Sequence, residues 1–486
     1  MEKKLGVLCH VSSIPSEYGI GDFGKSSREF IDFLSRNNFK IWQILPLNVT
    51  NEYNCPYSST CCYSIDEMYV DPEELLNEGK IERKDLKLLK KVSKTKKVDF
   101  DVVKKEKRRL LEKAYLKMDA NTKIDLEKEI KKSSWLYEYS CFRAILETYN
   151  TDNFRNVPKE YLETNTKEYK KFVKENEALI FKYAYFQYLV NKQWKKVREY
   201  AHGKSVNILG DLPIYPDQNS FDVYLNRNQF KLDKETLKPL VTGGVPADEF
   251  CEDGQNWGTC VYDWDYMKSL NYNFMISKTD ELLKKYDILR LDHFLGYVEH
   301  YEWDAKNPKK GKWYKKGGEE FFKVLEKNFD MNKIVIEDLG LYKRSATAVR
   351  KEFNLKGMCV LQMILENKNN IRYAPSKVEK NCLYYLGTHD NNTFIGYLKS
   401  LNKGDRKKFC SLVGIKDTNA KKMHIECIKK MVESQSEIVI LQIQDYLMQD
   451  EKYRMNVPGQ AAGCWEYKMP KKYEKRVKAL LNIIQC

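Results

Sequence analysis

The sequence predicts an α/β fold, a (β/α)8 TIM barrel with helical and loop insertions, and three observations lead to this prediction. Eight short apolar runs are spaced along the 486 residues, each typical of a buried parallel strand. Helical patterns separate most of these runs. Four runs end in acidic residues, as strands that carry a site at a barrel mouth would. A doubly wound open sheet is the alternative.

The expected strands lie at residues 5–11, 41–47, 206–215, 288–294, 334–339, 358–364, 383–388 and 438–443. After the first run, apolar residues from Phe30 to Leu34 recur at helical spacing. Helices are also expected at residues 319–329 and 345–353. This alternation of strand and helix is the pattern from which barrels are built.

Two long segments interrupt the alternation. Residues 71–203 are charged, rich in lysine and strongly helical, and a periodic stretch from residue 179 ends at Gly203. Residues 219–264 follow the third expected strand. We therefore expect a single catalytic barrel domain over residues 1–486, interrupted by a helical insertion subdomain at 71–203 and a smaller insertion at 219–264.

The formal net charge of +15 raises the possibility of a nucleic-acid partner. The basic residues are, however, mixed with acids, as in the segment 104–109, KKEKRR. Zinc-finger spacing, a Walker loop and an RNA-binding signature are all missing from the sequence. The charge is therefore interpreted as a solvated, lysine-rich surface, and no nucleic-acid partner is expected.

The cysteines indicate a reducing compartment. There are 13, an odd number, and they are scattered; Cys61 and Cys62 are adjacent and no CxxC pair occurs. The N-terminal residues lead directly into the first expected strand, and no apolar run reaches the ~18 residues of a membrane helix. A soluble, cytoplasmic protein without a membrane partner is expected. Nothing in the sequence indicates an oligomeric state.

Acidic residues stand where four of the expected strands end. The third run reaches Asp211, the fourth Asp292, the fifth Glu337 and the seventh Asp390. A single acid at such a point is commonly the N-cap of the next helix. Four acids at one barrel mouth indicate a site instead, because burying charge for scaffolding alone is costly.

Paired carboxylates suit the cleavage of a sugar bond, for which a retaining enzyme places them about 5–5.5 Å apart. Asp292 suits the nucleophile, because Arg290 shares its face of the strand and would keep it ionised and oriented. Glu337 suits the acid/base, which needs a raised pKa. Asp390 would stabilise charge on the sugar ring or hold its hydroxyl groups, and His389 could donate a hydrogen bond to the same sugar.

Ten segments in order along the chain resemble the 4-alpha-glucanotransferase family, also called amylomaltase or disproportionating enzyme, of the α-amylase clan. They are GVLCHVSSIPSEYGIGDFG, WQILPL, CPYSS, GDLPIY, GGVPADEF, GQNWG, LRLDHFLG, EDLG, GTHDNNT and RMNVPG. Each segment is short, but their number and order make the resemblance specific and extend it over nearly the whole chain. The resemblance implies the same barrel and the same roles for Asp292, Glu337 and Asp390.

The resemblance also implies a set of substrate-binding residues around the scissile bond. Tyr57 would stack under a glucose ring, although a packing role is equally compatible with its setting, and Asn456 would bind sugar or form a turn. The remaining candidates are Asp211, Gln255, Trp257, Arg290, His293 and His389. Maltooligosaccharides or α-glucans are the implied substrates.

The chain departs from the family pattern mainly in two loops. It has Ala247 where a second proline is usual and Glu249 where a tyrosine is usual. Thr259-Cys260 replaces the usual Asn-Pro after GQNWG. The three carboxylates are intact, so these changes are expected to affect the choice of acceptor rather than the chemistry. Two smaller departures are Asn392 in place of aspartate and the closing segment GCWEYK.

The predicted activity is transfer of α-1,4-glucan segments from a donor to the 4-hydroxyl of an acceptor by a retaining double displacement. Neither a metal nor an organic cofactor is expected, since the sequence has no zinc-ligand spacing and no dinucleotide fingerprint. The alternatives are an α-1,4-glucan hydrolase with the same carboxylates and a non-catalytic glucan-binding protein.

Overall fold

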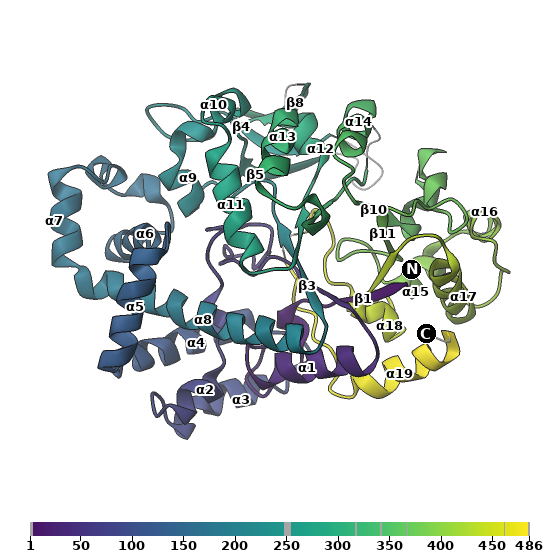
Figure 1. The fold of residues 1–486 in the computed structure, drawn as a ribbon, viewed down its shortest axis with the longest axis horizontal. Coiled ribbons are helices and arrows are strands. Elements are labelled where there is room, and N and C mark those ends of the chain that lie inside the picture. The colour runs from purple at the N-terminus through teal and green to yellow at the C-terminus, as the bar shows by residue number, and fades with distance from the viewer. Residues whose placement is uncertain are drawn as a thin grey trace.

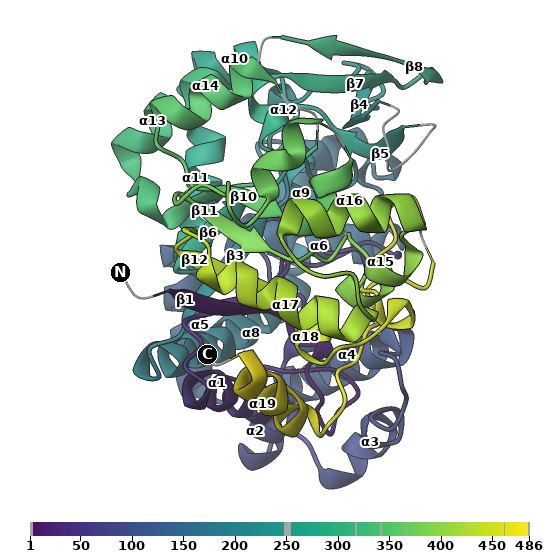
Figure 2. The ribbon, with the colours of Figure 1, turned by 90° about the vertical axis from the view of Figure 1, so that its right-hand side faces the viewer.

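The structure is a computed structural model that describes residues 3–246, 254–315, 318–340, 343–366, 368–460 and 462–484. A barrel of parallel strands forms its centre, and most helices surround it (Figure 1). The ends of the described chain lie near one another (Figures 1 and 2). Near the start, β1 (Lys4–Leu8) pairs with β12 (Ile438–Gln442), and the last helix, α19 (Tyr473–Ile484), packs against α17 (Ala420–Glu433).

Each of the eight predicted runs overlaps a strand of the barrel. The strands are β1 (Lys4–Leu8), β2 (Ile41–Gln43), β3 (Asn207–Leu212), β6 (Ile288–Leu291), β9 (Ile334–Ile336), β10 (Gly357–Val360), β11 (Cys382–Tyr385) and β12 (Ile438–Gln442). Several are shorter than the predicted runs because the last residues of those runs leave the hydrogen-bonded ladder. These residues form the mouth of the barrel, where loops replace strand pairing.

Parallel pairing runs through all eight strands in the order β10-β11-β12-β1-β2-β3-β6-β9. A parallel bridge between Val335 and Lys356 joins the two outer strands, and the Ile336 amide donates to the Lys356 carbonyl at 2.9 Å. The sheet therefore closes on itself. This closure confirms the barrel and excludes the doubly wound sheet, which needs two open edges.

Helices connect the strands in most of the predicted places. Those on the barrel are α1 (Lys25–Arg36), α11 (Asn273–Leu283), α13 (Glu319–Asn328), α14 (Arg344–Glu352), α15 (Phe394–Ser400), α16 (Lys403–Val413) and α17. Short 3-10 turns, at Leu361–Leu365 and Lys368–Tyr373, stand between β10 and β11 instead of a long helix. Two short helices lie next to the barrel mouth, α12 (Leu295–Val298) after β6 and α18 (Ile443–Tyr446) after β12.

Helices fill the segment from residue 71 to residue 203 and gather on one side of the molecule (Figure 1). They are α2 (Pro72–Asn77), α3 (Lys87–Val92), α4 (Phe100–Leu116), α5 (Ala120–Lys132), α6 (Leu136–Thr148), α7 (Lys167–Glu175) and α8 (Glu177–Gly203). Trp194 of α8 packs on Trp42 of β2, with ring centroids 6.4 Å apart. The C-terminal part of α8 thus covers the barrel itself, in the place of the helix between β2 and β3. The division of the chain into barrel and insertions remains a prediction.

An antiparallel sheet that the sequence analysis did not predict stands beside the barrel mouth (Figure 2). Its strands, in the order β5-β4-β7-β8, are β4 (Val241–Val245), β5 (Gln255–Cys260), β7 (His300–Asp304) and β8 (Asn307–Tyr314). The helices α9 (Phe221–Leu225) and α10 (Trp264–Ser269) flank β4 and β5 in the chain. β4 contains glycine and β8 contains lysine, so neither strand forms the apolar run that predicts a buried strand.

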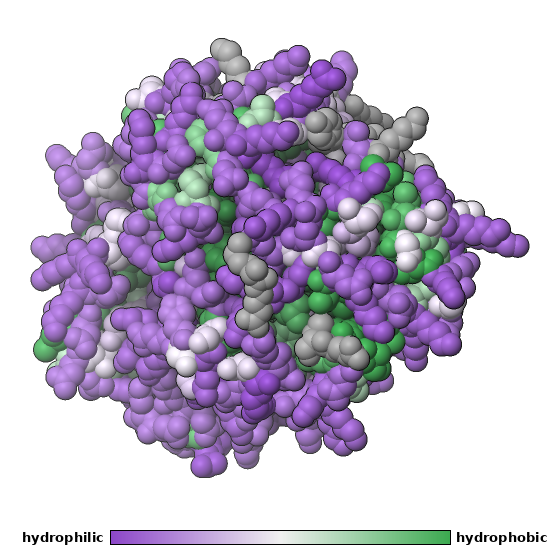
Figure 3. Space-filling model, turned by 45° about the vertical axis from the view of Figure 1, so that its right-hand side comes forward, coloured by the Kyte–Doolittle hydropathy of each residue, from purple (hydrophilic) through white to green (hydrophobic). Residues whose placement is uncertain are grey.

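The surface is mainly hydrophilic on the face drawn in Figure 3, with hydrophobic residues in limited areas. Many exposed lysines are paired with acids one helical turn away, as Lys25 is with Glu29 at 3.6 Å. Among the described residues, none of the helices combines the length and the apolar character that crossing a membrane requires.

Candidate active site

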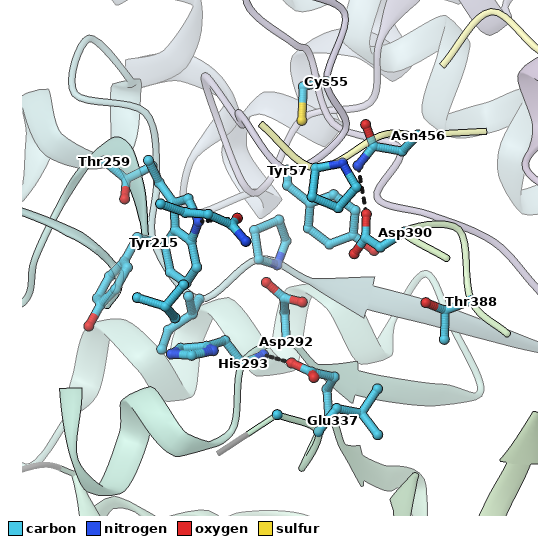
Figure 4. Close-up of a pocket in the computed structure, with 18 of the residues that line it drawn as sticks. Cys55, Tyr57, Tyr215, Thr259, Asp292, His293, Glu337, Thr388, Asp390 and Asn456 are labelled. Atoms are coloured by element: carbon cyan, nitrogen blue, oxygen red, sulfur yellow. Dashed lines mark hydrogen bonds between the residues drawn. The ribbon is translucent and has the colours of Figure 1, made fainter. Parts of the chain in front are cut away.

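A cavity of about 580 Å³ opens at the carboxyl ends of the barrel strands. Asp292 follows β6, Glu337 follows β9, and Asp390 stands in the loop after β11. All three carboxyl groups line this cavity, and Figure 4 shows their side chains directed toward a common space. The strand ends that the sequence analysis marked as acidic thus converge, because parallel strands deliver their carboxyl ends to one rim.

Arg290 is the charged centre beneath the cavity. Its Nη1 lies 3.0 Å from Asp292 Oδ1 and 2.7 Å from Asp211 Oδ2. The guanidinium is only 4% exposed and the Asp211 carboxylate is fully buried. The predicted contact between Arg290 and Asp292 is present, but the arginine is shared with Asp211. Tyr57 completes the group by donating its hydroxyl hydrogen to Asp211 Oδ2 at 2.7 Å.

Burial and the neighbouring charges have opposing effects on the pKa of Asp292. Burial raises the pKa of Asp292 to about 6, against the lowering effect of the Arg290 charge, and the nearby Asp211 and Asp390 carboxylates add to the rise. Burial therefore outweighs the arginine. A pKa near 6 still leaves most of the Asp292 population ionised at neutral pH, which is the form that can act as a nucleophile.

Glu337 is in the opposite protonation state at neutral pH. Burial raises the pKa of Glu337 to about 8; Arg290 opposes the rise, and the negative charge of Asp292 adds to it. The His293 amide donates to Glu337 Oε2 at 2.7 Å and orients the carboxyl group. The neighbouring Asp338 faces away, accepting hydrogen bonds from Arg350 at 3.0 Å and from the Met358 amide at 2.8 Å. A proton held by Glu337 is therefore available to the cavity.

Asp390 is the third carboxylate and the most acidic. Burial alone would raise the pKa of Asp390, but His389 and the Asn456 amide reverse the effect and lower it to about 2. His389 Nε2 lies 3.2 Å from Oδ2, and Asn456 Nδ2 donates to Oδ1 at 2.6 Å. Arg454 also holds the loop by donating to the Asp390 carbonyl at 2.9 Å. Asp390 is thus a fixed negative charge over the whole physiological pH range.

Aromatic rings form two parts of the cavity wall. The Tyr57 ring stacks on His389, with centroids 5.0 Å apart and an angle of 15°. The Trp257 ring meets His293 edge to face at 5.0 Å, and its Nε1 donates to Gln255 Oε1 at 3.3 Å. Flat rings beside polar groups suit sugars, which have apolar ring faces and a rim of hydroxyl groups.

The structure brings together nine of the eleven residues proposed from the sequence. They are Tyr57, Gln255, Trp257, Arg290, Asp292, His293, Glu337, Asp390 and Asn456. Asp211 and His389 lie behind this wall, 2% and 4% exposed. Asp211 contacts the cavity residues Tyr57 and Arg290, and His389 contacts Tyr57 and Asp390. Neither of the two lines the cavity itself.

Three residues near the cavity were not among the candidates predicted from the sequence. Arg454 stands in the quoted segment RMNVPG, so a signal for it existed. Trp465 lines the cavity with a backbone φ of 68°, an uncommon conformation for a large side chain, and its ring lies 6.1 Å from that of Tyr57. Trp313 of β8 also lines the cavity. Its lysine-rich segment carries no local signal of a site.

Of the four departures in the two loops, two can be placed and two cannot. Thr259 lines the cavity, and Cys260 is buried at 1% exposure. Ala247 and Glu249 lie outside the described residues. Within the part of the chain that the structure describes, no group of three or more His, Cys, Asp or Glu side chains is arranged to hold a metal ion. The cofactor-free reaction remains a prediction.

The closed barrel and the carboxylates at its carboxyl-end cavity define the class of this protein. It is a (β/α)8-barrel enzyme of the kind that acts on glycosidic bonds, with an ionised aspartate, a protonated glutamate and a second ionised aspartate facing one cavity.

Comparison with known proteins narrows the class to a family. The family model described as 4-alpha-glucanotransferase matches residues 9–473, and the chain belongs to this family. It is 34% identical to the 4-alpha-glucanotransferase of Aquifex aeolicus, with 98% of each chain covered, and 33% identical to that of Clostridium butyricum, with 94% of this chain and 95% of the relative covered. An amylomaltase from Streptococcus agalactiae, solved in complex with acarbose, superimposes with a TM-score of 0.91 at 28% identity, covering 100% of this chain and 99% of that one.

Proposed function

We propose that this protein redistributes α-1,4-glucan segments between maltooligosaccharides by a retaining double displacement. The observation that supports this proposal best is the set of three carboxyl groups that line one cavity, with pKa values near 6, 8 and 2. At neutral pH these values provide an ionised nucleophile, a protonated acid and a permanent negative charge.

In the first displacement, the Asp292 carboxylate attacks the anomeric carbon of the donor. The glycosidic C–O bond breaks, and the leaving oxygen takes the proton of Glu337. A covalent glucosyl-enzyme results. Asp390 faces the same space and stabilises the positive charge that develops on the sugar ring.

In the second displacement, the acceptor's 4-hydroxyl gives its proton to the Glu337 carboxylate and attacks the anomeric carbon. The bond to Asp292 breaks, the α-1,4 bond is formed again, and configuration is retained. Arg290 supports both steps by holding Asp292 in place. The other residues proposed for substrate binding, Tyr57, Gln255, Trp257 and His293 among them, would position the glucan.

Incubation with maltotriose tests the proposal. Transfer produces glucose together with a ladder of maltooligosaccharides longer than the substrate. Products that are all shorter than maltotriose would establish the hydrolase instead, because water would then be the acceptor. Absence of any product, with maltotriose still bound, would establish the non-catalytic alternative.

An Asp292→Asn variant tests the nucleophile. We expect transfer to fall by at least about 10³-fold, since the neutral amide cannot form the covalent intermediate. Asp265→Asn, an exposed aspartate of α10, is the matched control and should keep the parent rate. Unchanged turnover in Asp292→Asn would show that the nucleophile is assigned wrongly.

The finer features of the function also belong to the proposal. The structural relative named above was solved with acarbose, which supports oligosaccharides as substrates, and maltodextrin, starch and glycogen chains are the candidates. A cytoplasmic location and the lack of a nucleic-acid partner remain predictions from the cysteine pattern and the mixed surface charge. Retention on DNA or RNA that is sensitive to salt would contradict the second of them.

A further inference from the structure

Trp313 borders the catalytic cavity although it belongs to the antiparallel sheet and not to the barrel, in the long connection between the barrel strands β6 and β9. It lies on β8, the outer strand of the antiparallel sheet, and pairs with Tyr301 of β7. Its side chain is half-buried and lines the same cavity as Asp292 and Glu337. An indole ring so placed offers an apolar surface to whatever fills the cavity.

The Trp313 ring is held in place before any ligand binds. The Tyr301 ring meets it edge to face at 5.4 Å, and the Lys343 ammonium lies 4.4 Å from its centroid. Tyr301 is itself fixed between the Trp303 ring at 5.3 Å and Gly311, where a Cβ atom would come within 2.4 Å of the tyrosine ring. Ordering of the ring therefore costs little on binding, as for other rigid aromatic contacts.

The position of Trp313 relative to the carboxylates indicates which sugar it meets. Lys343 belongs to the segment that follows Glu337, and Leu339 and Gly340 of that segment line the cavity. The acid/base must lie beside the glycosidic oxygen that leaves, so the leaving glucan extends along this side. Asp390 and His389 lie on the loop after β11, and the Asp390 partner Asn456 lies after β12, which is a different part of the rim.

We propose that Trp313 forms a stacking subsite for the glucan that leaves in the first displacement and for the acceptor that replaces it in the second. The same subsite serves both, because the second step is the reverse of the first with another chain. This inference rests on the proposed function and adds a specificity-determining residue to it. The Lys343 ammonium covers part of the ring, and the remaining indole surface packs against the C–H groups of a glucose unit.

The test separates the two half-reactions. An α-maltosyl fluoride donor carries no leaving glucan, and its kcat/KM, followed as fluoride release, reports the first displacement alone, so this value should be the same in Trp313→Ala as in the parent. With that donor saturating, kcat/KM for maltotriose as acceptor should fall about 10-fold or more, since a buried aromatic contact is lost. Trp313→Phe keeps a ring and should recover most of the loss.

Tyr266→Ala is the matched control, since it removes an exposed ring of α10 that is outside the cavity. It should leave both half-reactions unchanged. An equal loss of kcat/KM for the fluoride donor and for the acceptor in Trp313→Ala, or loss of neither, would overturn the subsite. A thermal melt of each variant distinguishes loss of fold from loss of binding. If the parent enzyme itself makes no ladder from maltotriose, the proposed function fails independently of Trp313.

Discussion

The opposite protonation states of Asp292 and Glu337 predict how activity depends on pH. Below the pKa of Asp292, near 6, the nucleophile is protonated and cannot attack; above the pKa of Glu337, near 8, the acid has lost the proton it must donate. With these two values most of the enzyme is in the active form at pH 7, and only about a tenth of it is at pH 5 and at pH 9. A plot of kcat/KM against pH should therefore be bell-shaped with its maximum near pH 7.

The assay measures the initial rate of glucose release from maltotriose between pH 5 and pH 9 at constant ionic strength. The same enzyme is then given α-maltosyl fluoride, whose leaving fluoride needs no proton from Glu337. With that donor, kcat/KM for the first displacement should lose the alkaline limb and keep the acidic limb near pH 6. An alkaline limb of equal size with both donors would refute the assignment of Glu337 as the acid.

A buried carboxyl group other than Asp292 and Glu337 could also make the activity depend on pH between pH 5 and pH 9, so it needs a control. Asp445 has a pKa raised to about 7 by burial, and its Oδ1 accepts from the Phe394 amide at 2.8 Å, at the start of the helix that follows the Asp390 loop. Asp445→Asn keeps an acceptor oxygen and removes the titration. If the limbs belong to Asp292 and Glu337, the profile of this variant should match that of the parent.

Three further predictions concern the groups around the carboxylates. Asn456→Ala removes the hydrogen bond to Asp390 and should lower kcat about 10-fold with little change in KM. Maltotriose disproportionation measures both constants, and an unchanged kcat would contradict the role of Asn456 in holding Asp390. Arg290→Met leaves the buried Asp211 without its positive partner and should lower the free energy of unfolding by about 3–5 kcal/mol. Urea titrations measure this loss, and the double variant Arg290→Met/Asp211→Asn should recover part of it. Tyr57→Phe keeps the stack on His389 but loses the bond to Asp211, and a loss of about 1–2 kcal/mol is expected by the same titration; equal stability would mean that the hydroxyl contributes nothing.

The sequence predicted those residues of the candidate site that lie at or near the ends of expected strands. Arg290 and Asp292 are two residues apart on a strand, so their contact follows from the period of the strand. Asp211 could not be placed in the same way. Its strand end was recognised, but its burial behind Tyr57 and Arg290 depends on side chains that come from three separate segments.

The pKa values illustrate the same limit. The sequence predicts a raised value for Glu337 from its role, and the structure has it raised. It also suggests that Arg290 controls Asp292, whereas burial has the larger effect and raises the pKa of Asp292 above its ordinary value. Desolvation depends on the atoms that surround a group in space, and neighbours in the chain are a poor guide to them.

The sequence by itself determined the eight barrel strands, most of the helices between them, the three carboxylates and the resemblance to the family to which the chain belongs. These features depend on local periodicity and on short segments whose order is kept. The tertiary structure alone decided the closure of the barrel between Val335 and Lys356, the antiparallel sheet that pairs residues 241–244 with 301–304, and the placement of Trp313 at the cavity. Each of these joins segments whose contact is fixed by packing and pairing across the fold, and so no local pattern records it.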